Sequence, residues 1–305
     1  MRSASVLAFS LLALTATAQT SRSSKRGLVY VAPKEATDDS IWSSSSSDLT
    51  WYYNYQATPT AAFSNTKLQF VPMIWGAPSS DTDMTFYNTV ASLIDGGANV
   101  TWILAFNEPD GCTSGGSCVP ADTAAKTWIR QLEPLKKKYG VKLGAPAVTG
   151  APTGFSWLQN FFAACAGNCS ADFVPVHWYG NFEGLASHIG QVRGTYQNMS
   201  VWVTEYADAN VALKDSQTFY NQSSQYFDRI DYITHYSYFG SFRSSVSNVG
   251  PNAAMLDQNG RLTDIGSWYL GGSATGNVPK GGAAAAAAFA GWLFCVVGVG
   301  FWAGL

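Results

Sequence analysis

The chain has 305 residues, of which 18 are lysine or arginine and 20 are aspartate or glutamate, so its formal net charge is -2. A balance this close to neutral disfavours a surface that binds nucleic acid or anionic lipid. No cofactor-binding motif is apparent, and no cofactor is expected.

The N-terminal residues read as an export signal. Residues 1–18 contain one positive charge, the apolar run "SVLAFSLLALTA" and the small-x-small sequence Ala16-Thr17-Ala18. This order predicts a secretory signal peptide. Lys25-Arg26 then makes residues 19–26 a candidate propeptide, with ordinary solvation of two basic residues as the alternative.

The segment 27–270 alternates short apolar runs with longer amphipathic stretches, the pattern of βα units. Its eight candidate strands begin at Leu28, Trp51, Phe70, Thr101, Lys142, Phe173, Val201 and Ile233. Among the predicted helices, one is capped by Asp81, one runs from Ala121 to Gly140 and one opens at Asp215. No glycine-rich phosphate turn follows the first strand, so the expected fold is α/β, a single-domain (β/α)₈ TIM barrel of roughly 250 residues.

Two strands end on carboxylates. The fourth strand runs into Asn107-Glu108, and the seventh contains Glu205. Strands four and seven face each other across a barrel mouth, which brings such carboxylates within the roughly 5 to 5.5 Å of a retaining glycosidase. Glu205 is the predicted nucleophile and Glu108 the acid/base, whose pKa burial and the Glu205 charge are expected to raise.

The alternative for either glutamate alone is a surface salt bridge, but the pair on these strands favours catalysis. Asn107 is expected to donate to the sugar 2-hydroxyl. Asp110 is expected to cap its loop rather than react.

Aromatic and polar residues at other strand ends predict a polysaccharide cleft, because flat rings stack on pyranose faces. The further substrate-binding candidates are Tyr53, Asn54, Trp75, His177, Trp178, Tyr179, Tyr206 and Tyr236. Core packing is the alternative for each ring and the expectation for Trp102, Trp128 and Trp157. Tyr236 is also a candidate to orient the nucleophile, and His177 to contact the acid or the substrate.

Cysteine spacing predicts two disulfides in the exported domain. Four cysteines lie outside the apolar tail, and three pairings are possible. Their close spacings favour Cys112 with Cys118 and Cys165 with Cys169. The three histidines show no ligand spacing, so no metal site is predicted. Sequons predict glycosylation at Asn99, Asn168, Asn198 and Asn221.

The C-terminal residues 271–305 have the order of a glycosylphosphatidylinositol attachment signal. Small residues are followed by the polar spacer "TGNVPKGG" and an uncharged apolar tail. Attachment is expected at Gly272 or Ser273; the alternative is a transmembrane helix, since the tail is long enough to span a bilayer. The small residues, and the lack of basic residues after the tail, favour cleavage. The protein is then a secreted monomer, lipid-anchored at the outer face of the plasma membrane and the cell wall.

Four motifs, "NYQATP", "FNEPD", "HWYG" and "VTEYA", together resemble glycoside hydrolase family 128, which has an alkali-sensitive-linkage-protein-like glycosyl hydrolase catalytic core. The resemblance covers nearly all of residues 27–270. It implies retaining hydrolysis of β-1,3-glucan, with Glu108 matching the acid/base and Glu205 the nucleophile. The family pattern expected near strand two is W-x-N-W, whereas this chain has "WYYNYQ"; tyrosine keeps the stacking surface but bears on how many glucose units are held.

The predicted function is therefore an endo-acting β-1,3-glucanase of cell-wall glucan. Its rivals are a β-1,4-glucanase or mannanase of the same clan, and a wall protein that binds or transglycosylates glucan without hydrolysing it. Two facing carboxylates repel each other and have no use in a pure lectin. Transglycosylation uses the same pair of glutamates and stays an alternative. Endo or exo action depends on whether loops such as residues 111–120 close one end of the cleft.

Overall fold

The computed structural model describes residues 22–113 and 115–282. The predicted signal peptide and the apolar tail from residue 283 lie outside the described residues. Among the helices of the described part, none is both long and apolar enough to cross a membrane.

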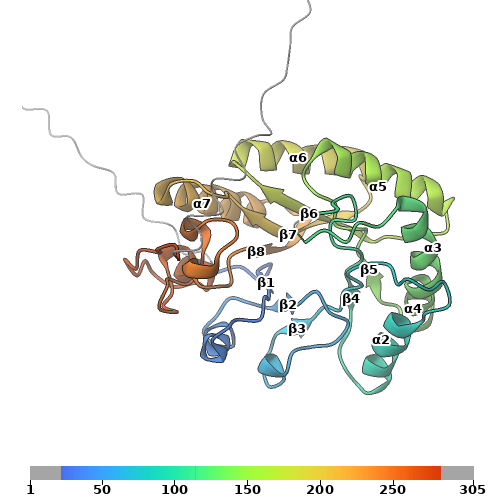
Figure 1. Cartoon of the computed structure of the whole chain (residues 1–305), viewed down its shortest axis with the longest axis horizontal. Coiled ribbons are helices and arrows are strands. Elements are labelled where there is room, and N and C mark those ends of the chain that lie inside the picture. Colours follow the sequence, from blue (N-terminus) through green and yellow to red (C-terminus); the bar gives the residue numbers. More distant parts are fainter. Residues whose placement is uncertain (1–21, 114, 283–305) are drawn as a thin grey trace, which may run out of the picture.

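Short parallel strands occupy the middle of the molecule, and helices lie around them (Figure 1). The strands are β1 (Gly27–Val29), β2 (Trp51–Tyr53), β3 (Gln69–Phe70), β4 (Trp102–Ile103), β5 (Lys142–Leu143), β6 (Phe173–Tyr179), β7 (Ser200–Ala207) and β8 (Ile233–Tyr238). All eight predicted strands are thus present. They pair in three parallel sheets, β1-β2-β3, β4-β5 and β6-β7-β8.

Single parallel bridges connect these sheets to one another. Met73 bridges to Leu104 beyond the ends of β3 and β4, Gly144 bridges to Phe173 of β6, and Arg26 bridges to Tyr236 of β8. The chain is therefore one α/β domain, whose strands follow one another in chain order.

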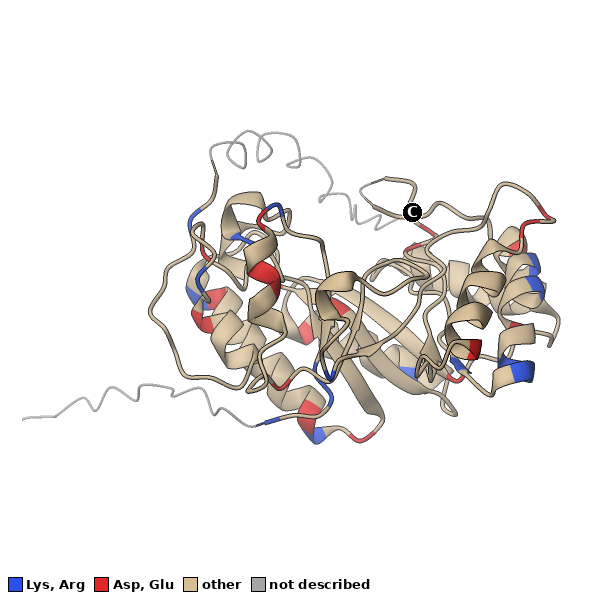
Figure 2. Cartoon of the chain, turned by 90° about the horizontal axis from the view of Figure 1, so that it is seen from below, with Lys and Arg blue, Asp and Glu red and all other residues tan. Residues whose placement is uncertain are grey.

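The α-helices are α1 (Asp39–Trp42), α2 (Thr85–Asp95), α3 (Ala121–Gln131), α4 (Glu133–Tyr139), α5 (Pro152–Cys165), α6 (Phe182–Thr195), α7 (Leu213–Arg229) and α8 (Asp264–Tyr269). Short 3₁₀ turns are η1 (Ala36–Asp38), η2 (Ala61–Phe63), η3 (Ser244–Val246) and η4 (Pro251–Ala253). Acidic and basic residues are interspersed along the outer helices (Figure 2).

Helix boundaries differ from the predictions at three places. Asp81 does not cap α2, because Asp83 accepts the Thr85 amide at 2.7 Å and Asp81 faces Arg130. The helix predicted from Ala121 to Gly140 is divided into α3 and α4, since Pro134 in the first turn of α4 has no amide hydrogen to continue α3. Helix α7 begins two residues before Asp215.

An aromatic cluster fills the space between strands of different sheets. The Trp202 ring of β7 stacks on the rings of His235 of β8 and Phe173 of β6, with 3.8 Å and 4.2 Å between ring centroids. Trp51 of β2 lies 5.0 Å from Trp202, and Trp102 of β4 lies 4.9 Å from His235. Burying these large apolar surfaces together holds the strand ends above them in fixed positions.

Arg26 fastens the first strand to the end of the domain. Its buried guanidinium donates to Asp48 at 3.1 Å, to the carbonyls of Trp268 and Tyr269, and to the Tyr236 hydroxyl. Both residues of the candidate dibasic site are held, because the Lys25 ammonium also donates to three carbonyls near the end of α7. Proteolytic processing after Arg26 stays a prediction, and it would remove the hydrogen bonds that Lys25 and Arg26 make with the rest of the domain.

The segment after α8 also packs on the domain. Asp264 accepts the amides of Thr275 and Gly276, and Ser267 donates to the carbonyl of Ser273. The Lys280 amide donates to Ser244 at 3.2 Å. The predicted polar spacer is therefore part of the folded domain up to residue 282.

Arg26→Met is expected to lower the free energy of unfolding by about 3 to 5 kcal/mol, since it removes the guanidinium that pairs with the buried Asp48 carboxylate and donates to the Tyr269 carbonyl. Arg22→Ala is the matched control, because Arg22 approaches the same Asp48 only at 3.9 Å with an exposed side chain, and is expected to cost under about 1 kcal/mol. Urea unfolding of the two variants measures the difference; equal stabilities would contradict the role of Arg26.

Candidate active site

Glu108 stands just beyond β4 in an unusual backbone conformation. Its φ of 40° is rare for a residue with a side chain and costs about 1 to 3 kcal/mol. The surrounding chain holds it there: the Glu108 amide donates to the Ala147 carbonyl, and its carbonyl accepts the Gly111 amide. A residue kept in a strained conformation by its neighbours is typical of a functional site.

A bulge in β7 aims Glu205 at Glu108. Val203 pairs with Val176 of β6, but the next pair is Glu205 with His177, so Thr204 is the extra residue. A bulge reverses the alternation of side chains beyond it. As a result Glu205 points to the same side as Trp202, toward the space between the strands, and only 5% of it is exposed.

The alternation along β6 sends His177 and Tyr179 toward Glu205, and Trp178 the other way. Trp178 stacks on His188 of α6, donates to the Asn181 carbonyl, and lies so close to Gly184 that an added Cβ would be 2.3 Å from its ring. The prediction that Trp178 binds substrate is therefore corrected: it fixes α6 against the sheet.

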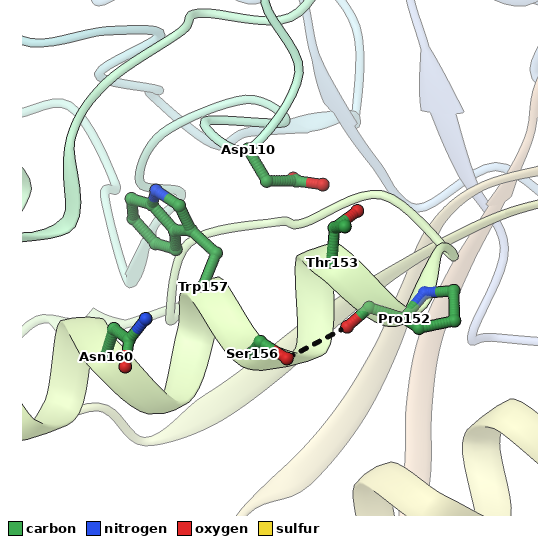
Figure 3. A pocket seen from close by; sticks show the side chains of 6 residues that line it. All are labelled: Asp110, Pro152, Thr153, Ser156, Trp157 and Asn160. Carbon is green, nitrogen blue, oxygen red and sulfur yellow. Dashed lines mark hydrogen bonds between the residues drawn. The ribbon is translucent and has the colours of Figure 1, made fainter.

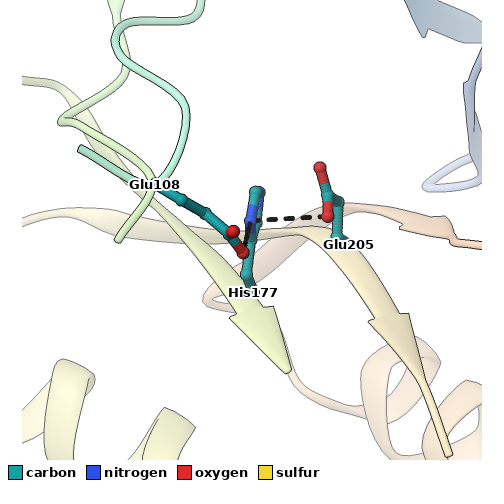
Figure 4. A group of neighbouring side chains, drawn as sticks. All are labelled: Glu108, His177 and Glu205. Carbon is teal, nitrogen blue, oxygen red and sulfur yellow. Dashed lines mark hydrogen bonds and ion pairs between the residues drawn. The ribbon is translucent and has the colours of Figure 1, made fainter. Parts of the chain in front are cut away.

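His177 lies between the two carboxylates (Figure 4). Its Nδ1 is 3.0 Å from Glu108 Oε1 and 3.5 Å from Glu205 Oε2. One ligand-type atom from each of the three residues lies within 4.8 Å of the other two. The same spacing would suit a metal ion, but Nδ1 is engaged by Glu108 and both Glu205 oxygens already accept phenol hydrogen bonds, so we interpret the group as an acid–base site.

The His177 contact reverses the predicted pKa of Glu108. Burial acts to raise this pKa, but the hydrogen bond and positive charge of His177 together lower it below the ordinary glutamate value. For His177, burial acts to lower the pKa, while the charges of Glu205 and Glu108 and the Glu108 hydrogen bond raise it overall. The expectation of a raised Glu108 pKa is thus wrong, because the contact with His177 outweighs the effect of burial.

Tyrosine hydroxyls surround Glu205. Tyr179 donates to Oε2 at 2.5 Å, Tyr55 donates to Oε1 at 2.7 Å, and Tyr53 lies 3.4 Å from Oε1. Burial and the Glu205 charge raise the pKa values of all three phenols well above the ordinary one, so each keeps its proton. Tyr55 is absent from the sequence-based candidates, although its two-residue spacing from Tyr53 indicates that the two rings share a face.

Three other candidates lie away from the carboxylates. Tyr206 is fully buried behind β7 against Phe227 and Tyr238. Tyr236 donates to Asp228 and accepts from Arg26, so it neither binds substrate nor orients Glu205. Asn54 donates to the Thr58 carbonyl and accepts the Gln56 amide, so it holds its own turn. The binding roles predicted for these residues are corrected.

Trp75 and Asn107 remain next to Glu108. The backbone amide of Asn107 donates to the Trp75 carbonyl and its side-chain amide donates to the Gly115 carbonyl, while Asn107 Oδ1 has no hydrogen-bond partner among the described residues. The Trp75 ring is 42% exposed, which suits a stacking surface. The role of Asn107 toward a 2-hydroxyl stays a prediction.

A shallow depression of about 420 Å³ adjoins this region (Figure 3). It is lined by Asp110, Pro152, Thr153, Ser156, Trp157 and Asn160. Asp110 accepts the Thr149 amide and hydroxyl, which agrees with the predicted loop-capping role. Trp128 is buried as predicted, whereas Trp102 and Trp157 are only partly so.

Both predicted disulfides, Cys112–Cys118 and Cys165–Cys169, are present. The first closes the loop that follows Glu108. Of the sequon asparagines, Asn99, Asn168 and Asn198 are exposed, and Asn221 is half-buried in α7. Their glycosylation stays a prediction.

A family model described as "Glycosyl hydrolase catalytic core" matches residues 27–269, almost the whole described domain. The chain belongs to this glycosyl hydrolase family. The predicted resemblance and the predicted enzyme class are thereby confirmed.

Individual relatives agree with the family. The chain is 28% identical over 258 residues to Alkali-sensitive linkage protein 1 of Schizosaccharomyces pombe, covering 81% of this chain but only 44% of that protein. A family 128 subgroup II endo-β-1,3-glucanase from Sorangium cellulosum is 26% identical, with a TM-score of 0.65 and coverage of 82% and 99%. A subgroup VII oligosaccharide-binding protein from Cryptococcus neoformans is 26% identical, with a TM-score of 0.62 and coverage of 81% and 92%.

The three histidines are expected to titrate differently in an NMR experiment. His177 should have a pKa above the ordinary value of about 6.5 because of its two carboxylates, whereas burial keeps His188 below it and lowers the pKa of His235 to about 4. Glu108→Gln removes one negative charge and should lower the pKa of His177 alone. A His177 that titrates below the ordinary value in the unchanged protein would contradict the ion pair.

Proposed function

We propose that this protein is a retaining hydrolase of β-1,3-glucan. The observation that carries the proposal is the approach of Glu108 and Glu205 within 4.8 Å, because an inverting enzyme separates its carboxyl groups by roughly 6.5 to 9.5 Å to admit a water molecule. The substrate class rests on the similarity to the Sorangium cellulosum enzyme, on the exposed Tyr179 bonded to Glu205, and on the exposed Trp75, whose carbonyl accepts the Asn107 amide.

In the first step a Glu205 oxygen bonds to the anomeric carbon while the glycosidic bond breaks. The leaving oxygen takes a proton from Glu108, which has received it from His177 along their 3.0 Å hydrogen bond. In the second step water gives a proton to Glu108 and its oxygen to the anomeric carbon, and the ester to Glu205 breaks. The pair then again holds one proton, and the product keeps the β configuration.

The eight strands are proposed to close into one (β/α)₈ barrel, the scaffold that brings β4 and β7 together. Support comes from the bridges that link the three sheets, including Arg26 with Tyr236 between the two ends of the strand order. The meeting of Trp51, Trp102 and Trp202, from strands two, four and seven, also requires strands that curve around a common centre.

Endo action is the proposed mode, following the same relative. The second candidate function is binding of glucan oligosaccharides without hydrolysis, which the Cryptococcus neoformans relative favours. Glu108 gives this candidate a physical basis, since an acid whose pKa is lowered needs His177 to supply its proton.

Wild-type protein is expected to release short β-1,3-oligosaccharides from β-1,3-glucan. Glu108→Gln and Glu205→Gln should each lower kcat by at least about 1000-fold, because one removes the proton donor and the other the nucleophile. Glu183→Gln, the same change at an exposed position of α6, is the control and should match wild type. Chromatography gives the product lengths, and NMR of the first products gives the anomer.

Binding without release of sugars by any of these proteins would support the oligosaccharide-binding function instead. Longer products from short donors would indicate transglycosylation, and glucose as the sole early product would indicate exo action. Faster cleavage of β-1,4-glucan or mannan would refute the substrate class. An initial α anomer would refute the retaining mechanism.

The protein is further proposed to be exported and held by a glycosylphosphatidylinositol anchor at the outer face of the plasma membrane, with its substrate in the cell wall. The order of small residues, spacer and apolar tail supports this localisation. The spacer's hydrogen bonds to Asp264 and Ser244 mean that attachment at Gly272 or Ser273 would remove a packed segment.

Phosphatidylinositol-specific phospholipase C is expected to release the full chain, expressed in a secretory eukaryotic host, from the cell surface. Mass spectrometry of the C-terminal peptide then identifies the attachment residue. A chain that ends at residue 282 is the control and should be secreted free. Protein that resists the phospholipase and still contains the tail would instead be a transmembrane protein.

A further inference from the structure

Tyr55, which is not among the candidates predicted from the sequence, contacts one of the two carboxylates. It lies two residues beyond β2, half-buried, and its hydroxyl is 2.7 Å from Glu205 Oε1. Its sequence neighbours Asn54 and Gln56 bond only within the turn and to Met73. Of these three consecutive residues, Tyr55 is therefore the one whose side chain contacts Glu205.

Tyr55 is the main donor to Oε1, because a phenol has one hydrogen to give. The nearby Tyr53 hydroxyl is closer to the Thr204 carbonyl, at 3.1 Å, than to Oε1, at 3.4 Å, so its contact with Oε1 is the weaker of the two. Tyr179 and His177 approach only the other oxygen, Oε2. Tyr55 thus makes the shorter of the two phenol hydrogen bonds to this oxygen of Glu205.

The backbone of Tyr55 is held in a strained conformation. Its φ is 61°, in the left-handed region that a side chain disfavours. The Asn54 side chain closes the turn from both sides by donating to Thr58 and accepting the Gln56 amide, and the Met73 amide donates to the Gln56 carbonyl. In addition, the Tyr55 ring packs edge-on against Tyr53 at 5.0 Å. These contacts fix the direction of the ring and so of its hydroxyl.

We infer that Tyr55 is a positioning residue that fixes the orientation of the Glu205 carboxylate through Oε1. Tyr55 donates to Oε1 and Tyr179 donates to Oε2. Together the two hydrogen bonds restrict rotation of the Glu205 carboxylate, so that one of its oxygens faces the anomeric carbon. The expected effect on turnover rests on the proposed function, whereas the expected effect on the orientation of the Glu205 carboxylate does not.

Tyr55→Phe is the sharpest test, since it keeps the ring and the strained backbone and removes only the hydroxyl. With β-1,3-oligosaccharides, kcat is expected to fall about 10- to 100-fold, the range of a charge-assisted hydrogen bond, while KM changes less than about threefold. Tyr52→Phe is the matched control: Tyr52 is the neighbouring tyrosine of β2, packs on Phe63 and Phe70, and should leave kcat unchanged.

A crystal structure of Tyr55→Phe provides a readout that does not depend on the substrate. The Glu205 carboxylate is expected to rotate away from its wild-type orientation, with an unchanged melting temperature. A carboxylate that superposes on wild type, or a kcat within twofold of wild type, would overturn the inference. If wild type itself cleaves no glucan, the proposed function fails, and the orientation of Glu205 in the variant still decides the role of Tyr55.

Discussion

The repulsion between two carboxylates in one nearly dry site is the constraint on which the rest of the structure depends. Glu108 and Glu205 approach within 4.8 Å, and both side chains are mostly shielded from water. Two such charges are tolerated only with compensating donors and positive charge. The His177 ring lies against both carboxylates, and its pKa is raised by their charges, while the phenols of Tyr55 and Tyr179 donate to Glu205. Catalytic geometry and electrostatic stability are therefore met by the same side chains.

The strands place these groups through two backbone irregularities. The extra residue Thr204 turns Glu205 inward, and the buried Thr204 carbonyl accepts hydrogen bonds from Tyr53 and Ser237. The positive φ of Glu108 moves its carboxylate off the line of β4 toward His177. Each irregularity costs free energy locally, and the hydrogen bonds around it and the aromatic cluster below offset that cost.

Features that depend on residues close together in the sequence could be predicted, whereas features that depend on the pairing of distant strands could not. The strands and the two glutamates were predictable because apolar runs that end on a carboxylate are a local pattern. The roles of Trp178 and Tyr206 were misjudged because adjacency in sequence was taken for adjacency in space, whereas neighbours on a strand point to opposite faces. The bulge at Thr204 could not be predicted, since it exists only relative to the pairing with β6. The same holds for the Glu108 pKa, whose direction depends on where β6 places His177.

The lowered pKa of Glu108 makes substrate binding part of the acid's activation. In the free protein 18% of the Glu108 side chain is exposed, while His177 is almost completely buried. A sugar that covers Glu108 removes the remaining water, and desolvation favours the neutral carboxyl group over the carboxylate. In the proposed mechanism, a proton then passes from His177 to Glu108 as the leaving oxygen arrives. An arrangement of this kind offsets the repulsion between the carboxylates in the empty site, because His177 lies between them.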